Sequence, residues 1–202
     1  MRIWSEWWKW AGKLRGACSI ERTFIWMLVS IVGFSIREDL LGVTSFIRCI
    51  GLQSFFYDRL IDFFHTPALC VAELARIWTS AVIGSHPGIV RHDGRPILVC
   101  DGIKIAKSGK KMPGVKRLHQ ESESNSKPDY IMGHSCQAIC VLAGCLASVV
   151  AIPLAARIHD GVVFSNRDKR TTLDKMAMLI SELGMTEKSS SCWPMRITRQ
   201  RR

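Results

Sequence analysis

Residues 96 to 101 read PILVCD, a short apolar run that ends in an aspartate. Gly102 follows directly, and residues 102 to 117 contain six lysines and arginines and no acidic residue. Apolar runs of this length with β-branched residues are typical of buried strands. We therefore predict a strand that Asp101 closes and that opens onto a basic loop. A carboxylate in that place suits metal-assisted chemistry on a polyanion.

Three more elements are predicted after this loop. Residues 130 to 143 and 148 to 158 are rich in apolar and β-branched residues, which indicates two strands. Residues 170 to 183 then have helical spacing, with Gly184 as a natural C-cap. The apolar stripe of this helix is Leu173, Met176, Ala177 and Ile180.

The chain before the PILVCD run is predicted to be helical. Residues 1 to 84 repeat apolar side chains every three to four positions, and Thr66-Pro67 should end one helix and start the next, which runs to about Ile83. The turn residues between 85 and 94 are predicted to mark the boundary to the strand-rich part. We predict helices first and a mixed α/β region afterwards.

Two apolar segments raise the question of a membrane. Residues 23 to 36 are apolar over 14 positions, which is short of the roughly 18 to 20 needed to span a bilayer. A buried core helix is the better interpretation. Residues 2 to 15 mix four tryptophans with lysines and arginines, as an interfacial helix does. Packing of the tryptophan face on the protein is favoured, because tryptophan-rich helices usually serve packing.

The net charge and the spacing of the cysteines indicate the kind of partner and the cellular compartment. The net charge of +11 favours a polyanionic partner, either nucleic acid or an anionic membrane surface. The eight cysteines form no C-x-x-C pair, so they indicate reduced thiols in a cytoplasmic protein.

The order strand with Asp, strand, strand, helix resembles the first half of the RNase H-like catalytic core of insertion-sequence DDE transposases. The helical part resembles the amino-terminal DNA-contacting region of the same family. The segments that carry this second resemblance are GVTSFIR at 42 to 48, Gly51-Leu52, Tyr57 and Phe63-Phe64. Thr44 or Ser45 is expected to cap a helix whose first turns expose Arg48.

The resemblance implies a site and its partners. Asp101 would be a catalytic carboxylate that binds Mg²⁺ or Mn²⁺ together with a second Asp and a later Glu, and the substrate would be the DNA of the transposon ends. The basic loop would run along phosphates. The residues expected to contact DNA are Arg48, Lys104, Lys107, Lys110, Lys111, Lys116 and Arg117. A homo-oligomer or an intact transposase copy is a possible protein partner, and no membrane is expected.

Other polar residues have less specific interpretations. Glu121 and Glu123 lie in a Ser/Asn-rich stretch and are expected to be solvated loop residues. His134 with Cys136, Cys140 and Cys145 matches no common zinc motif, and strand alternation should divide these side chains between two faces. His159 and Asp160 precede Gly161, and a turn explains them.

The last residues do not continue the pattern. The family places its second Asp on a strand after the helix, but residues 186 to 202 have no strand pattern. One permitted choice of codons for Ser190 to Thr198, read from the last base of the first codon, gives Leu-Val-Leu-Ala-Asp-Ala-Tyr-Tyr. This is an apolar strand ending in Asp, so we expect a frameshift before the second catalytic position.

The sequence therefore predicts an α + α/β chain, with a helical amino-terminal region followed by an incomplete RNase H-like mixed sheet with a helix. The expected parts are residues 1–88 for DNA binding, 89–187 for the partial catalytic domain and 188–202 for an out-of-frame tail. The expected function is that of a transposase, truncated and inactive as this fragment. The alternatives are a non-catalytic DNA-binding protein that modulates an intact transposase and, as a weaker rival, a membrane-surface protein.

Overall fold

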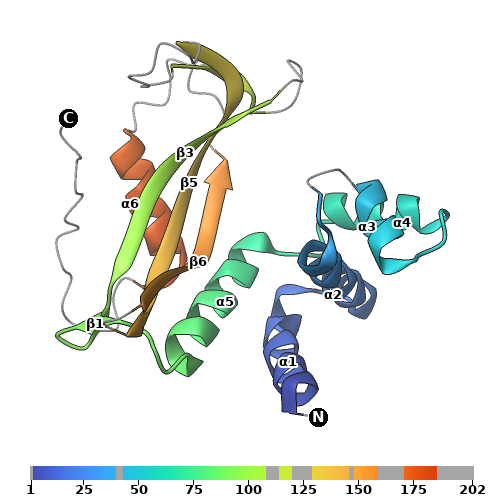
Figure 1. Cartoon of the computed structure of the whole chain (residues 1–202), viewed down its shortest axis with the longest axis horizontal. Coiled ribbons are helices and arrows are strands. Elements are labelled where there is room, and N and C mark those ends of the chain that lie inside the picture. The colour runs from blue at the N-terminus through green and yellow to red at the C-terminus, as the bar shows by residue number, and fades with distance from the viewer. Residues whose placement is uncertain are drawn as a thin grey trace. The chain divides into compact units, whose positions relative to one another are not determined.

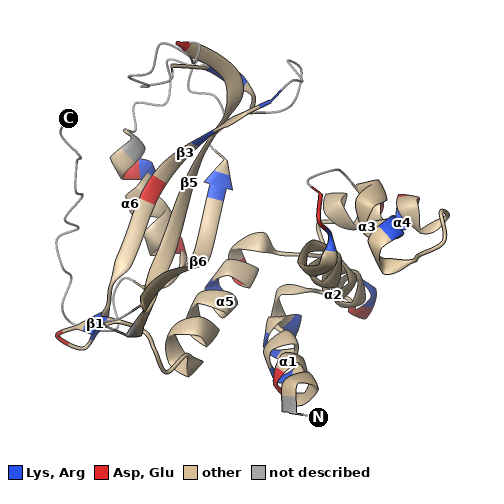
Figure 2. Cartoon of the chain, in the orientation of Figure 1, with Lys and Arg blue, Asp and Glu red and all other residues tan. Residues whose placement is uncertain are grey.

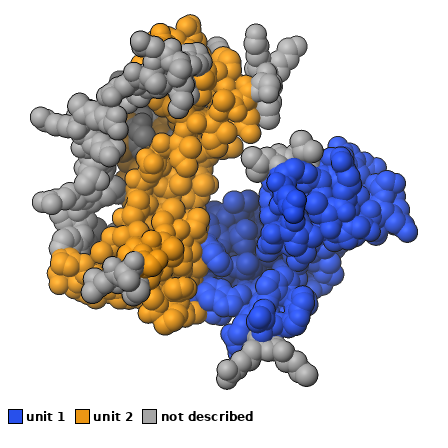
Figure 3. All heavy atoms as spheres, in the orientation of Figure 1, with its two compact units in different colours: residues 1–81 blue, residues 82–202 orange. Residues whose placement is uncertain are grey.

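The computed structural model describes residues 2–39, 43–107, 114–119, 129–145, 148–158 and 171–185. The chain divides into two units, residues 1–81 and 82–202 (Figure 3). Described helices make up the first unit, and the second combines antiparallel sheets with a helix (Figure 1). The structure is therefore α+β in its coarse class, as the order of helical and strand patterns predicted.

The first unit contains α1 (Arg2–Lys13), a short 3-10 turn η1 (Leu14–Ala17), α2 (Glu21–Ile36), α3 (Val43–Ile50) and α4 (Phe56–His65). The last helix, α5 (Val71–Ser85), runs across the division between the units. The end of α4 at His65 confirms the predicted stop at Thr66-Pro67, because the residue before a proline is restricted to extended backbone. The next helix begins later than predicted, at Val71.

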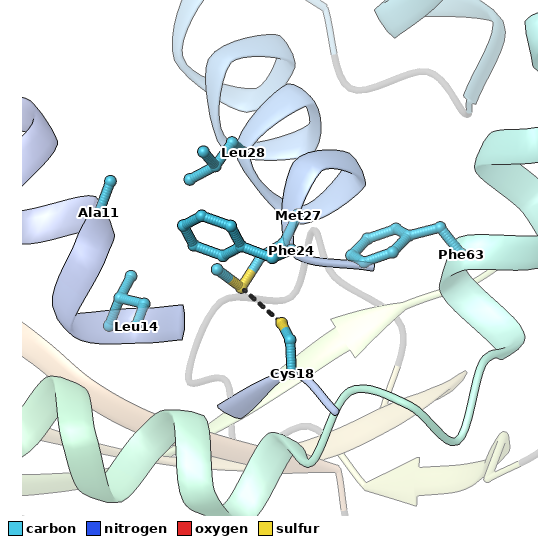
Figure 4. Packing of buried hydrophobic residues seen from close by; sticks show 7 residues of the cluster. All are labelled: Ala11, Leu14, Cys18, Phe24, Met27, Leu28 and Phe63. Carbon is cyan, nitrogen blue, oxygen red and sulfur yellow. Dashed lines mark hydrogen bonds between the residues drawn. The ribbon is translucent and has the colours of Figure 1, made fainter. Parts of the chain in front are cut away.

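The main core of the helical unit joins α1, η1, α2 and α4. Its buried members are Ala11, Leu14, Cys18, Phe24, Met27, Leu28 and Phe63 (Figure 4). The Sγ atom of Cys18 lies 4.0 Å from the Sδ atom of Met27, and burial raises the pKa of this thiol. The cysteine therefore acts as a small apolar core residue.

The tryptophans of α1 divide between two environments. Trp7 packs against the core, and the ring of Trp10 lies 5.9 Å from that of Trp78. Trp4 and Trp8 remain 70% and 56% exposed. Packing of the tryptophan face on the protein is thus confirmed for Trp7 and Trp10 but wrong for Trp4 and Trp8, which lie at the edge of the apolar stripe.

Helix α2 buries only one face. Phe24, Met27 and Leu28 are buried, whereas Ile25 and Phe34 are more than half exposed. The prediction of a buried core helix therefore holds for one face of α2, which contributes to the core, and not for the opposite face. Among the described residues, no helix combines the length and apolar character needed to cross a bilayer.

Helix α3 packs against α2 and α4 through a second cluster, formed by Phe46, Ile47 and Leu60. Its first turn differs from the prediction, because Thr44 and Ser45 lie inside the helix and Ser45 is buried. The apolar spacing of Val43, Phe46, Ile47 and Ile50 explains the earlier start. Neither hydroxyl side chain is therefore the N-cap.

The second unit opens with a two-residue hairpin. Strands β1 (Arg91–His92) and β2 (Arg95–Pro96) pair antiparallel around Asp93 and Gly94, whose φ angles are both positive. Positive φ at both central residues is the geometry of a type I′ hairpin turn. The predicted turn at His92-Asp93-Gly94 is therefore confirmed.

The larger sheet is built around one long strand. Strand β5 (Tyr130–Cys145) pairs antiparallel with β3 (Leu98–Ala106), with β4 (Lys116–His119) and with β6 (Ser148–Ile158). Because residues 136 to 141 of β5 pair with both β3 and β6, these two strands lie on opposite edges of β5. The described sheets are antiparallel throughout, and the mixed sheet that the resemblance implied would need a parallel strand in addition.

Strand β5 comes unusually close to β3 at one point. A Cβ atom on Gly133 would overlap the carbonyl oxygen of Ile105, so only a glycine allows this approach. Gly133 pairs with both Ala106 and Lys116. It is the place where the end of β3, the start of β4 and the central strand meet.

Helix α6 (Thr172–Glu182) covers one face of this sheet (Figure 1). It begins with a capping box, in which Thr171 and Asp174 satisfy each other's backbone N–H groups. Met176, Leu179 and the C-cap residue Leu183 are buried. The predicted stripe is therefore right for Met176, half-buried at Ile180 and wrong for the exposed Leu173 and Ala177. The C-terminal role of Gly184 is confirmed by its φ of 70° and by its N–H bond to the Ser181 carbonyl.

Candidate nucleic-acid interface

Asp101 lies in the middle of β3, not at its end. The strand continues through Lys104 to Ala106, because Ile103 and Ile105 extend the β-branched alternation and pair with β5. The prediction that Asp101 closes a strand was therefore wrong. The side chain is exposed, and one carboxylate oxygen accepts a 2.7 Å hydrogen bond from the Gly102 N–H.

The face that carries Asp101 is opposite to the face under α6. Arg157 pairs in register with Gln137 and forms an ion pair with Glu182 of α6, so the helix covers the side of Gln137 and Ile139. Asp101 pairs with Ala138, which points the other way because successive strand residues alternate. Val99, Ile103 and Ile105 share this side and are each more than 40% exposed. The carboxylate therefore lies on an open, largely apolar face.

Three of the predicted DNA contacts gather where β3 and β4 meet β5. Lys104, Lys107 and Arg117 are all exposed (Figure 2 shows Lys and Arg in blue). The Nζ atom of Lys104 donates a 2.7 Å hydrogen bond to the His119 carbonyl, and the Lys107 N–H donates to the Met132 carbonyl at 2.8 Å. What was predicted to be one basic loop is thus partly strand, which fixes the backbone of Lys104 and Lys107.

Lys116 differs from these three residues because it is only 9% exposed. Burial, with a further contribution from the charge of Lys175, lowers the pKa of Lys116. Strand alternation explains the difference, since Lys116 and Leu118 point toward the α6 side and Arg117 and His119 point away. The side chain of Lys116 therefore anchors β4.

A tyrosine completes the basic region. The Arg117 guanidinium carbon lies 4.1 Å from the ring centroid of Tyr130, and the ring of His119 lies 5.1 Å from it. Tyr130 is 49% exposed. Sequence reasoning identified neither Tyr130 nor His119 as part of a site. The signal that was missed is the alternation in KRLH at 116 to 119, which places Arg117 and His119 on one side.

Of the three remaining predicted contacts, the structure describes only Arg48. Arg48 lies exposed on α3 in the helical unit. Lys110 and Lys111 lie outside the described residues, as do Glu121, Glu123, His159, Asp160 and the predicted tail from residue 188.

The histidine and cysteines that were considered for zinc all lie on β5. His134, Cys136 and Cys140 pair with Ile105, Ile103 and Val99 and so share one face. Alternation therefore does not divide these three, and the side chain of the fourth residue, Cys145, lies outside the described residues. His134 and Cys140 are six residues apart, which is about 20 Å along a strand and too far for one ion. Across the described ranges, no group of three or more His, Cys, Asp or Glu is placed to hold a metal ion.

Comparison of the chain with family models, curated proteins and solved structures found no match. The fold and the chemistry of the exposed residues therefore carry the functional argument.

Proposed function

We propose that the chain is part of an insertion-sequence DDE transposase and that it binds DNA. The observation that carries the proposal is the order of β3, β5 and β6. Strand β5 pairs antiparallel with β3 on one edge and with β6 on the other, the short β4 comes between β3 and β5 in the sequence, and a helix on one face follows β6. The resemblance to an RNase H-like core would make β3 its first strand, and we propose that Asp101 in β3 is the first metal-binding carboxylate of that core.

The distribution of charge supports DNA as the substrate. Lys104, Lys107 and Arg117 present three cations near one end of the large sheet, on a chain of net charge +11. Cations at fixed positions bind phosphates by releasing condensed counterions, which gives affinity without sequence preference. Arg48 on α3 would add a contact from the helical unit.

Strand cleavage needs more than the described residues supply. Two-metal chemistry uses several carboxylates to hold and neutralise the ions. Asp101 has no such partners among the described side chains. The residues described here therefore do not by themselves fit a Mg²⁺ pair, and the 202-residue chain is proposed to bind DNA without cutting it.

The same observation favours the alternative of a non-catalytic DNA-binding protein that modulates an intact copy. The two proposals differ in one respect. A transposase would have a complete set of metal-binding carboxylates in its active form, whereas a non-catalytic DNA-binding protein would not. In either case we propose a cytoplasmic protein, since the described cysteines are free thiols.

The test measures how tightly the 202-residue protein binds a 30-base-pair DNA duplex of arbitrary sequence. Fluorescence anisotropy is used to detect binding at several salt concentrations. We expect saturable binding that weakens steeply with salt, by the counterion-release relation. No binding at 50 mM salt, or binding that does not depend on salt, would contradict the proposal.

A further inference from the structure

Tyr130 is placed as an exposed ring beside a fixed cation. Tyr130 is the first residue of β5, and about half of its surface is open to solvent. The Arg117 guanidinium carbon lies 4.1 Å from the ring centroid, and Arg117 is itself exposed. A guanidinium plane stacks on aromatic rings and keeps its N–H donors available for phosphate.

The pair is held in place by several contacts. His119 pairs with Tyr130 in register, and Arg117 pairs with Met132 two residues further along β5. Lys116 and Leu118 bury the opposite side of β4, and Lys104 bonds the His119 carbonyl. Side chains that are already ordered lose less entropy when they bind a ligand.

A purely structural role does not explain the exposure. An exposed cation–π contact stabilises a fold by only about 0.5–1 kcal/mol. A ring that served packing alone would be better placed on the α6 side, where Leu118 is buried. Exposed aromatic rings next to cations are the usual way in which proteins bind unpaired bases, because every base has a face that can stack.

We propose that Tyr130, with Arg117, is a stacking platform for an unpaired nucleobase of single-stranded DNA. This inference rests on the proposed DNA-binding function, and it adds that the bound DNA includes single-stranded DNA. Tyr130 is eight residues along β5 from Ala138, the partner of Asp101, which is about 26 Å at strand spacing. The platform therefore contacts DNA away from Asp101.

The test uses two fluorescein-labelled probes with the whole chain, a 20-nucleotide oligothymidine and a 20-base-pair duplex. Tyr130→Leu should weaken binding to the oligothymidine by roughly 5- to 150-fold, the equivalent of 1–3 kcal/mol for one stacked base. Tyr130→Phe should retain the affinity, and binding of both variants to the duplex should change less than about twofold by the same reasoning. The salt dependence should not change, because no charge is removed.

The chain offers a matched control. Leu173 on α6 is an apolar side chain of the same unit that is 55% exposed, and it is not among the proposed DNA contacts. Leu173→Ala should leave oligothymidine binding unchanged. If Tyr130→Leu does not fold, as judged by circular dichroism, Tyr130→Trp tests the same idea, because a larger ring should strengthen oligothymidine binding and leave the duplex unaffected.

The outcomes separate the two proposals. Absence of DNA binding overturns the proposed function and the platform together. Salt-dependent binding that Tyr130→Leu leaves unchanged, or weakens equally for both probes, overturns the platform alone. A loss with Tyr130→Phe as large as that with Tyr130→Leu would also overturn it, since the hydroxyl group would then be the contact.

Discussion

Replacement of Lys104, Lys107 and Arg117 by alanine removes the three exposed cations around the meeting point of β3, β4 and β5. If each contacts one phosphate of duplex DNA, the slope of log affinity on log salt should become less steep by about 2.7, at roughly 0.9 per phosphate. When the salt concentration is raised from 50 to 200 mM, both proteins lose affinity for DNA. The factor by which the unchanged protein loses affinity should be about 40 times the factor for the variant.

The effect must be separated from that of net charge. Lys9, Lys13 and Arg22 are exposed residues of the helical unit, and their replacement by alanine lowers the net charge by the same three units, from +11 to +8. This control should keep the original slope. Anisotropy titrations at five salt concentrations measure both variants, with circular dichroism to confirm folding. Equal slopes in the two triple variants would refute the assignment of DNA contacts to this part of the sheet.

Three further predictions concern stability, measured by urea denaturation. Gly133→Ala should lower the free energy of unfolding by about 1–3 kcal/mol, because its Cβ meets the Ile105 backbone, whereas Gly102→Ala, whose nearest atom would be 3.9 Å away, should have little effect. Equal losses would contradict this. Thr171→Ala should cost about 0.5–2 kcal/mol by removing the cap of α6, and an unchanged midpoint would count against the cap. Lys116→Met should stabilise the protein at pH 7, because the folded state disfavours the charged ammonium. The folded pKa of Lys116 is lowered below its ordinary value of 10.5, so the free energy of unfolding of the unchanged protein should rise as the pH increases between these two values. The difference in stability between Lys116→Met and the unchanged protein should therefore shrink over the same pH range. A constant advantage between pH 7 and 10 would contradict the assignment.

The strands rich in apolar and β-branched residues were predictable from the sequence. The predicted bounds of β6, 148 to 158, are those of the structure, because the segment is apolar almost throughout and contains Val149, Val150, Ile152 and Ile158. Strand β3 was predicted too short, since Gly102 and Lys104 look like loop residues. Pairing with β5 overrides these local preferences, and pairing cannot be seen in one segment alone.

The candidate site was predictable only in part. The sequence identified Asp101 and the run of cations after it, but not that Lys116 is buried and Arg117 exposed. That difference depends on which face of β4 meets α6, a tertiary property. Tyr130 was missed for the same reason, since its contact with Arg117 follows from the register between β4 and β5.

The central claim is that Asp101 is a metal-binding carboxylate of a DDE transposase. The most direct measurement extends the chain through the shifted reading frame at codon 190 and incubates it with Mg²⁺ and linear DNA that carries the gene with its flanking sequence. We predict nicks at the ends of the element that require the metal ion, and their loss in Asp101→Asn, which keeps the side-chain shape and removes the charge. Equal cleavage by the extended protein with and without Asp101→Asn would contradict the account, as would metal-dependent cleavage by the 202-residue chain alone.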